Sequence, residues 1–228
     1  HENFSDNHGE EGETDNAEIA ALREYSAKAL LATLFFANGT PMLLAGDELG
    51  NSQQGNNNGY CQDNEITWLD WASAKRKRNR ELLKFVQQVL EIFHEQPVFH
   101  RRKFFSGRAI SGEQAADIAW IDPEGTEMTK EQWNAPGTRC FSVVLFGDSI
   151  DVDEEGEEIS GDTLLILFNA DHTETIPFTL PNIEENQSWQ RLIDTYETKV
   201  SEDEFAEGTS YALRPCSMAL FRMGTEEE

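Results

Sequence analysis

The spacing of apolar residues changes near Pro97, and this change constrains the fold more than any other feature of the 228-residue chain. Before it, apolar side chains recur three and four residues apart, which predicts helices with one buried stripe. After it, short apolar runs stand between Gly, Pro, Asn and Asp residues, which predicts short antiparallel strands. We therefore expect two domains, residues 1–97 of an α/β type and residues 98–228 of an all-β type.

The first domain is expected to contain a helix, a buried strand and a second helix. Asp15 followed by Glu18 predicts a capping-box start for the first helix, and the Asn-Gly pair at residues 38–39 predicts its end. Residues 41–45 are continuously apolar between two glycines, as in a strand that is buried on both faces of a parallel sheet. The second helix is predicted from residue 73 to residue 94 and stops before a proline.

The second domain is expected to be an antiparallel β-sandwich. Short strands at this spacing, each bounded by turn residues, are typical of two packed sheets. The predicted strands are residues 140–146, 163–169, 175–180, 189–194 and 217–222.

Charge and cysteine content exclude several classes of partner. A formal net charge of −25 repels phosphate backbones and anionic lipid, so neither nucleic acid nor a membrane surface is expected as a partner, whereas a neutral sugar polymer is compatible. The longest apolar run, residues 29–37, is far shorter than the roughly 20 residues of a membrane span. Three widely spaced cysteines predict free thiols and a cytoplasmic location. The histidines show no metal-ligand spacing, so no metal or other cofactor is predicted.

Asp47 and Glu48 are the most conspicuous carboxylates because they directly follow the predicted buried strand. In α/β barrels, residues just past the carboxyl ends of the strands face the active site. Adjacent side chains on an extended chain point to opposite sides, whereas the two carboxylates of a retaining glycosidase must flank one bond about 5 Å apart. We therefore expect Asp47 and Glu48 to orient substrate or loops, or to anchor the structure, rather than to form a catalytic pair.

The loop that follows is rich in amide side chains. Asn57, Asn58, Tyr60 and Asp63 supply hydrogen-bonding groups and one aromatic ring, which are suited to sugar hydroxyls and to a pyranose face. The alternative is a loop held together by Asx-turns, in which an Asn or Asp side chain bonds the backbone two residues on. Trp68 and Trp71 either extend a sugar platform or pack in the core, and their spacing before a helix favours the core.

Two charged segments have simpler interpretations. The basic run at residues 75–80 begins a helix in a strongly acidic chain, so a solvated helix face paired with acidic neighbours is favoured over a nucleic-acid site. Residues 151–162 imitate a calcium-binding loop imperfectly and lack flanking helices, which favours an acidic loop between two strands over a calcium site.

Several blocks of sequence together resemble one family. They are GTPMLLAGDE at 39–48, GNNNGYCQDN at 55–64, TWLDW at 67–71, RRKFFSG at 101–107 and DIAW at 117–120. This combination resembles the eighth-strand region and C-terminal β-domain of isoamylase-type glycogen debranching enzymes of the α-amylase superfamily. The resemblance implies the C-terminal end of a (β/α)8 barrel, its last strand and flanking helices, followed by the β-sandwich.

The resemblance also implies a reaction and a set of site residues. Such enzymes hydrolyse α-1,6 branch linkages of glycogen or limit dextrin with retention, which requires a carboxylate nucleophile and a carboxylic acid. In the family these groups lie on earlier barrel strands, which would precede His1, so we assign no catalytic residue here. The loop after strand eight is expected beside the substrate cleft. Its candidate substrate-binding residues are Asp47, Glu48, Asn57, Asn58, Tyr60 and Asp63.

Three hypotheses about function remain open from the sequence. The first is a C-terminal part of a debranching enzyme, inactive alone, whose partner is α-glucan through the parent enzyme. The alternative is a stand-alone carbohydrate-binding or barrel-stabilising module, and the third is a structural remnant with no ligand. Because a lone barrel strand has no parallel neighbours, we also expect residues 1–97 to be rearranged, self-associated or less ordered than the β-domain.

Overall fold

The chain forms two compact units, which we call the helical unit (His1–His94) and the β-unit (Glu95–Glu228). The structure is a computed structural model that describes residues 6–107, 117–148, 150–152, 155–183, 187–197 and 203–225. No helix within these residues is both long and apolar enough to cross a membrane.

The first helix, α1 (Ala17–Phe36), is present as predicted, but its cap differs. Asn16 is the N-cap, because its side-chain oxygen accepts hydrogen bonds from the backbone N–H groups of Glu18 and Ile19 at 3.0 and 3.4 Å. The predicted capping by Asp15 is therefore wrong by one residue, since only the residue at the first turn can reach these two donors. The helix ends before Gly39, whose φ of 142° lies outside the helical region.

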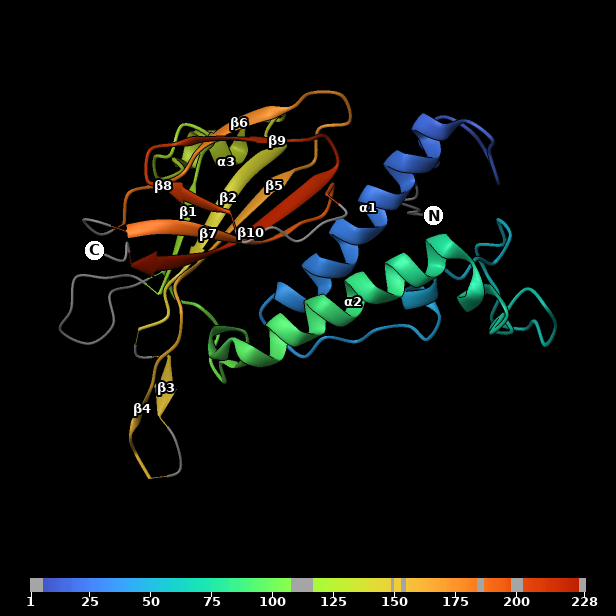
Figure 1. Cartoon of the computed structure of the whole chain (residues 1–228), viewed down its shortest axis with the longest axis horizontal. Helices are drawn as coiled ribbons and strands as arrows, with labels where there is room; N and C mark the ends of the chain where they lie inside the picture. The colour runs from blue at the N-terminus through green and yellow to red at the C-terminus, as the bar shows by residue number, and fades with distance from the viewer. Residues whose placement is uncertain are drawn as a thin grey trace. The chain divides into compact units, whose positions relative to one another are not determined.

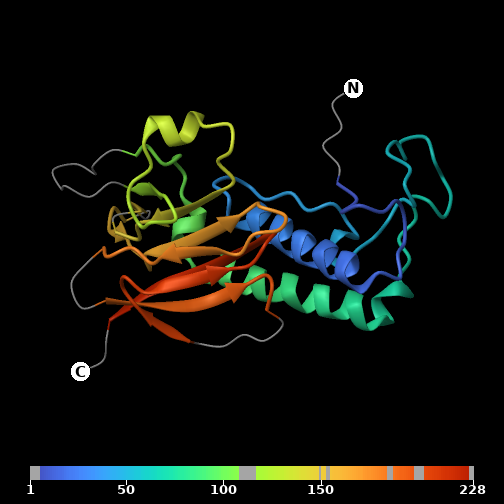
Figure 2. The ribbon, with the colours of Figure 1, turned by 90° about the horizontal axis from the view of Figure 1, so that it is seen from above.

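The second helix, α2 (Lys77–Glu95), follows a short 3₁₀ turn, η2 (Ser73–Lys75), and buries one stripe of side chains. That stripe consists of Leu82, Phe85, Val86, Val89 and Phe93. Figures 1 and 2 show α1 and α2 side by side and running in the same direction. The rings of Phe35 and Phe93 are 6.0 Å apart, and the ammonium of Lys28 lies 5.9 Å from the ring of Phe85. The described residues of this unit contain helices and no strand, so the unit is helical and the predicted α/β type is wrong for it.

The predicted buried strand at residues 41–45 is wrong for this structure. These residues are irregular, Met42 is 85% exposed and Leu44 is also exposed. A strand is stable only when neighbouring strands take up its backbone hydrogen bonds, and no strand within the described residues pairs with this segment. A short 3₁₀ turn, η1 (Asp47–Leu49), follows it instead.

The β-unit is built on a six-stranded antiparallel sheet. In spatial order its strands are β1 (Ile118–Ile121), β2 (Cys140–Leu145), β5 (Leu164–Asn169), β10 (Ser217–Thr225), β7 (Gln187–Asp194) and β8 (Glu204–Ala206). The register pairs Val144 with Leu165 and Leu220 with Ile166, so apolar side chains line up across the sheet. A register shift between Leu220 and Phe221 marks a bulge in β10.

A second pair of strands covers one face of this sheet. β6 (Ile176–Thr179) and β9 (Ser210–Leu213) pair antiparallel, and Figure 1 shows them above the larger sheet. Phe178 and Leu213 from this pair share one core with Leu165 and Phe221 of the large sheet, and all four are fully buried. The predicted antiparallel β-sandwich is therefore confirmed.

Two smaller elements complete the β-unit. The short helix α3 (Lys130–Asn134) lies between β1 and β2, and a 3₁₀ turn, η3 (Pro97–His100), follows α2. Within the stretch predicted as an acidic loop, β3 (Asp151–Val152) and β4 (Glu158–Ile159) pair as a hairpin, which Figure 1 shows extending away from the sheet. Residues 153–154 of the calcium-like stretch lie outside the described residues.

Candidate functional site

The candidate site in the helical unit is the loop of residues 46–72, which contains η1 and ends at η2. Its first residue must be glycine for two reasons. Gly46 has a φ of 103°, and a Cβ there would lie 2.6 Å from Cδ2 of Leu69 and 2.9 Å from Cβ of Asn51. The start of the loop is thus held against its later part by a close backbone approach.

Asp47 and Glu48 lie on a 3₁₀ turn rather than on an extended chain. The premise of an extended chain at these two residues is therefore wrong. Glu48 Oε2 accepts a hydrogen bond from the Gly46 N–H at 2.8 Å, so this carboxylate braces the turn. Asp47 is exposed, and its pKa is raised by partial desolvation and by the negative charge of Glu48. The pair provides one bracing carboxylate and one exposed hydrogen-bond acceptor.

The amide-rich part of the loop is organised by Asx-turns. Asn56 Oδ1 accepts from the Asn58 N–H at 2.9 Å, and Asn58 Oδ1 accepts from the Tyr60 N–H at 3.4 Å. Asn64 Oδ1 accepts from the Ile66 N–H at 3.0 Å in the same way. These bonds use side-chain oxygens rather than NH₂ groups. Asn57 and Asn58 are both exposed, and each carries an NH₂ donor group. The loop therefore combines an Asx-turn scaffold with exposed donors.

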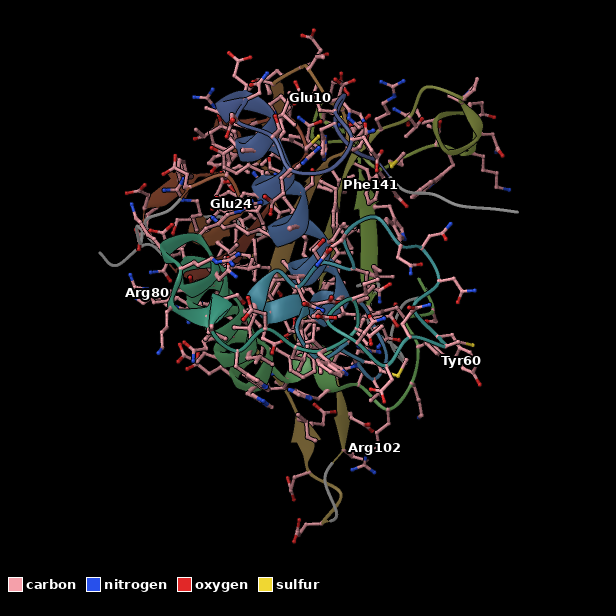
Figure 3. All side chains as sticks on the ribbon, turned by 90° about the vertical axis from the view of Figure 1, so that its right-hand side faces the viewer. Glu10, Glu24, Tyr60, Arg80, Arg102 and Phe141 are labelled. Atoms are coloured by element: carbon pink, nitrogen blue, oxygen red, sulfur yellow. The ribbon has the colours of Figure 1, made fainter. Side chains whose placement is uncertain are left out.

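Three aromatic side chains of this loop are exposed. Tyr60 is 93% exposed, and Figure 3 shows it at the outer edge of the loop. Trp68 and Trp71 are exposed as well, so the expectation that they pack in the core is wrong. The indole N–H of Trp68 donates to Asp63 Oδ1 at 2.9 Å, which fixes the ring against the loop and occupies one oxygen of that carboxylate. The structure thus brings a carboxylate and aromatic rings to the surface of one loop.

The basic run before α2 is paired with acidic neighbours, as the sequence predicts. Arg76 Nη2 lies 3.6 Å from Asp70 Oδ2, and Lys77 Nζ lies 3.7 Å from Glu81 Oε1. All four side chains are well exposed, so these pairs are solvated and individually weak.

The three cysteines, Cys61, Cys140 and Cys216, are free thiols. Burial is the main cause that raises the pKa of the Cys140 thiol, which keeps it neutral. A neutral thiol is a poor nucleophile, so Cys140 is not suited to covalent catalysis.

An aromatic cluster in the β-unit was not predicted from the sequence. Trp120 on β1, Trp133 on α3 and Phe141 on β2 form a triangle, with ring centroids 5.1 Å apart for the two tryptophans and 5.7 Å from each tryptophan to Phe141. Trp120 is 37% exposed and Trp133 is 43% exposed. The only signal in the sequence was the alternation of side chains along β1, which puts Trp120 on the face opposite to Ile121 of the core.

A groove of about 380 Å³ lies in the same part of the β-unit. Its polar lining comes from Asp122, Gln132, Arg139 and Asp171, and Met128 and Ile176 add apolar surface. Although burial raises the pKa of Asp122, hydrogen bonds from Thr126 and Gln132 outweigh it and lower that pKa. Backbone N–H donors lower the pKa of Asp171, and Arg139 Nη1 lies 3.2 Å from its Oδ2. Both carboxyl groups are therefore ionised near neutral pH.

The chain is similar to known proteins of glycogen metabolism. Residues 117–224 match the family model described as "Isoamylase, C-terminal". The glycogen operon protein GlgX homolog of Mycobacterium tuberculosis (strain ATCC 25618 / H37Rv) is 42% identical over 195 residues, which cover 85% of this chain and 27% of that protein. The glycogen debranching enzyme of Pectobacterium carotovorum subsp. carotovorum (strain PC1) is 43% identical over 145 residues, which cover 64% of this chain and 20% of that protein. The chain thus spans about a quarter or less of the length of these relatives.

Among solved structures, the trehalulose synthase MutB from Pseudomonas mesoacidophila MX-45 is similar with a TM-score of 0.46 and 20% identity, covering 89% of this chain and 39% of that one. The family model and the sequence relatives agree with the blocks of sequence described above. The resemblance to isoamylase-type glycogen debranching enzymes is therefore confirmed, and residues 117–224 of this chain match the isoamylase C-terminal family model.

Proposed function

We propose that this chain is the C-terminal part of a glycogen-debranching glycoside hydrolase that acts on α-1,6-glucosidic branch linkages of glycogen or limit dextrin. The observation that carries the proposal is the sequence identity of 42–43% to a glycogen operon protein GlgX homolog and to a glycogen debranching enzyme, combined with the isoamylase C-terminal match. The contribution of the chain itself is to bind α-glucan, with the catalytic carboxylates supplied by other parts of the parent enzyme.

The exposed loop of the helical unit has the groups that glucan binding requires. Tyr60 offers an exposed ring for the face of a glucose unit. Asn57 and Asn58 offer amide N–H donors, and Asp47 offers an acceptor to sugar hydroxyls. Glu48 and Asp63 support the loop indirectly. Glu48 accepts a hydrogen bond from the Gly46 N–H, and Asp63 accepts one from the Trp68 indole N–H.

The chain alone is proposed to be inactive. Retaining glycosidases need a nucleophile and an acid on either side of the scissile bond, about 5 Å apart. Asp47 and Glu48 do not meet that requirement, because Glu48 is held by the Gly46 N–H within the same turn and is not set across a cleft from Asp47. No other residue is proposed as catalytic.

Two measurements test this proposal. Incubation of the chain with limit dextrin should release no reducing ends above background, whereas the full parent enzyme should debranch it, and measurable release by the chain would overturn the inactivity. The loop is tested by electrophoretic retardation in glycogen-containing gels. Tyr60→Ala should reduce the retardation, Tyr60→Phe should preserve it, and equal loss in both variants would argue against ring stacking.

The second candidate function is a non-catalytic carbohydrate-binding or barrel-stabilising module that acts by itself. The core of the β-unit favours it, because Phe178, Leu213 and Phe221 belong to one buried cluster whose residues all come from the β-unit. This candidate predicts that glucan binding survives when residues 1–94 are removed. Loss of all binding in that variant would overturn the stand-alone binding module, and the first proposal, a C-terminal part of a debranching enzyme, would remain.

A further inference from the structure

The β1–α3–β2 region of the β-unit carries two features that the loop site does not use. One is the aromatic triangle of Trp120, Trp133 and Phe141, and the other is the groove lined by Asp122 and Arg139. We propose that this region, which we call the β1–α3 site, is a second α-glucan-binding site. The choice of α-glucan as the ligand rests on the proposed function, but the site and its residues are separate from the loop of the helical unit.

The tryptophan rings are braced so that their exposed surfaces are held in place. Trp133 meets Trp120 edge to face at an interplanar angle of 79°, and Phe141 packs against both. Phe141, which Figure 3 labels on β2, is itself 5.1 Å from the ring of Phe168 on β5. Rings fixed in this way lose little conformational entropy when a ligand stacks on them. They therefore suit a flat, weakly polar ligand surface such as a pyranose face.

The short helix α3 is also fixed, which sets the position of Trp133. Thr129 Oγ1 accepts from the Gln132 N–H at 3.2 Å, and Gln132 Oε1 accepts from the Thr129 N–H at 2.7 Å, which is a complete capping box. Gln132 Nε2 donates to Asp122 Oδ2 at 2.8 Å, and the Met128 N–H donates to the carbonyl of Trp120 at 2.8 Å. A helix of five residues is thus tied to the end of β1.

The groove and the tryptophan platform are neighbours on α3. Gln132 lines the groove, and the next residue in the helix is Trp133 of the aromatic triangle. Consecutive helical residues point about 100° apart, so the same turn presents a polar groove on one side and a ring on the other. The volume of about 380 Å³ lies within the usual range of small-molecule sites. A chain of sugar units that stacks on the ring can therefore also reach polar groups.

The charges of the groove restrict the class of ligand. Asp122 and Asp171 are ionised, and Arg139 offsets only one of them, in a chain of net charge −25. An anion is therefore repelled. The Arg139 side chain is mostly exposed and has further N–H donors beyond the one to Asp171. The exposed Thr138 in the groove lining donates its hydroxyl hydrogen to the Gln132 carbonyl, so its oxygen can accept from a ligand. Donors and acceptors beside an aromatic ring fit a neutral, polyhydroxylated ligand.

The experiment uses the whole 228-residue chain and measures its retardation in native gels that contain glycogen. Trp133→Ala removes an exposed ring, and we expect about tenfold weaker apparent binding by the β1–α3 site. Trp133→Phe should retain most of the binding because a ring remains. Arg139→Ala, at a mostly exposed side chain, should weaken binding without affecting the fold. Phe104→Ala is the matched control, because Phe104 is 80% exposed in the same unit but outside the site.

The outcomes separate this inference from the proposed function. Weaker binding in Trp133→Ala and Arg139→Ala, but not in Phe104→Ala, supports the β1–α3 site, whatever Tyr60→Ala does. Binding lost in Tyr60→Ala but unchanged in Trp133→Ala and Arg139→Ala overturns this inference and leaves the loop site of the proposed function intact. Equal loss in Trp133→Ala and Phe104→Ala would also overturn it. If the near-ultraviolet circular dichroism spectrum shows that Trp133→Ala is misfolded, Arg139→Ala decides the question alone.

Discussion

Single buried side chains explain how the β-unit keeps its strands and turns in register. Asn169, at the end of β5, is almost fully buried, and its side-chain Nδ2 donates to the carbonyls of Glu174, Leu213 and Arg214 at 2.9–3.1 Å. Its Oδ1 accepts from the Asp171 N–H at 2.9 Å. One amide thus ties the end of β5 to the end of β9 and to the turn that carries a groove residue.

The first prediction concerns this amide. Asn169→Ala should lower the free energy of unfolding of the β-unit by about 2–3 kcal/mol, because it leaves buried carbonyl groups without a donor. Urea unfolding followed by near-ultraviolet circular dichroism measures the change. Asn57→Ala, at an exposed residue, is the control and should change the free energy by less than about 0.5 kcal/mol. A loss below about 1 kcal/mol for Asn169→Ala would contradict the structural role.

The second prediction concerns pH and Asp122. Burial acts to raise the pKa of this carboxyl group, but hydrogen bonds from Thr126 and Gln132 outweigh it and hold the pKa below its ordinary value in the folded chain. A folded pKa below the unfolded one stabilises the fold above the unfolded pKa, and this contribution disappears as pH falls through the folded value. The free energy of unfolding should therefore fall less steeply below about pH 4 in Asp122→Asn than in the unmodified chain. Identical slopes in denaturant titrations at several acidic pH values would refute this.

At the scale of elements, the loop of residues 46–72 depends on a glycine as much as on its Asx-turns. Gly46 has a positive φ, and a Cβ atom added to it would lie 2.6 Å from Cδ2 of Leu69. The backbone bonds from the Leu49 and Asn51 N–H groups to the Gly46 carbonyl, at 3.0 and 2.9 Å, depend on this geometry. The exposed Tyr60 is presented by a loop that starts from this point.

The third prediction tests that dependence. Gly46→Ala should destabilise the loop by about 2 kcal/mol, because it adds both backbone strain and a steric clash. Hydrogen exchange of the Leu49 and Asn51 amides should become faster by more than tenfold. Gly12→Ala is the matched control. Gly12 also has a positive φ, of 73°, but a Cβ atom added to it would have no other atom within 4 Å. Equal effects of the two variants would mean that strain alone matters and that the clash does not.

The sequence predicted those elements whose signal is local. The stripe of α2 and the strands β2 and β5 follow from the spacing of their own apolar residues. The strand predicted at residues 41–45 did not form, because a strand requires partners that no local pattern can supply. The short strands β1, β8 and β9 were missed, since a few residues give too little periodicity to distinguish a strand from a loop.

The candidate site was predictable to the same limited degree. The amide-rich loop carries its own signature, and the structure contains both the Asx-turns and the exposed side chains that the two interpretations required. The exposure of Trp68 and Trp71 could not be predicted, because a tryptophan next to a helix has the same local pattern whether it is buried or exposed. The triangle of Trp120, Trp133 and Phe141 joins three elements and is visible only once they are packed together.

At the scale of the whole molecule, the exposed apolar side chains of the helical unit predict self-association. Leu30, Met42 and Leu44 are all exposed, which is unfavourable in water and is relieved by contact with another chain. Light scattering should show a mass that rises with protein concentration. The double variant Met42→Ser, Leu44→Ser should reduce this rise, whereas Val152→Ser, at an exposed apolar residue of the β-unit, should not. A concentration-independent monomer mass for the unmodified chain would contradict the prediction.

The central claim is that this chain binds α-glucan through two surfaces, the loop that carries Tyr60 and the β1–α3 site that carries Trp133. Isothermal titration of the chain with maltoheptaose tests it most directly. The account predicts saturable binding heat that is reduced in Tyr60→Ala and in Trp133→Ala, and that is lost when the two substitutions are combined. The absence of binding heat in the unmodified chain, or unchanged heat in the double variant, would contradict it.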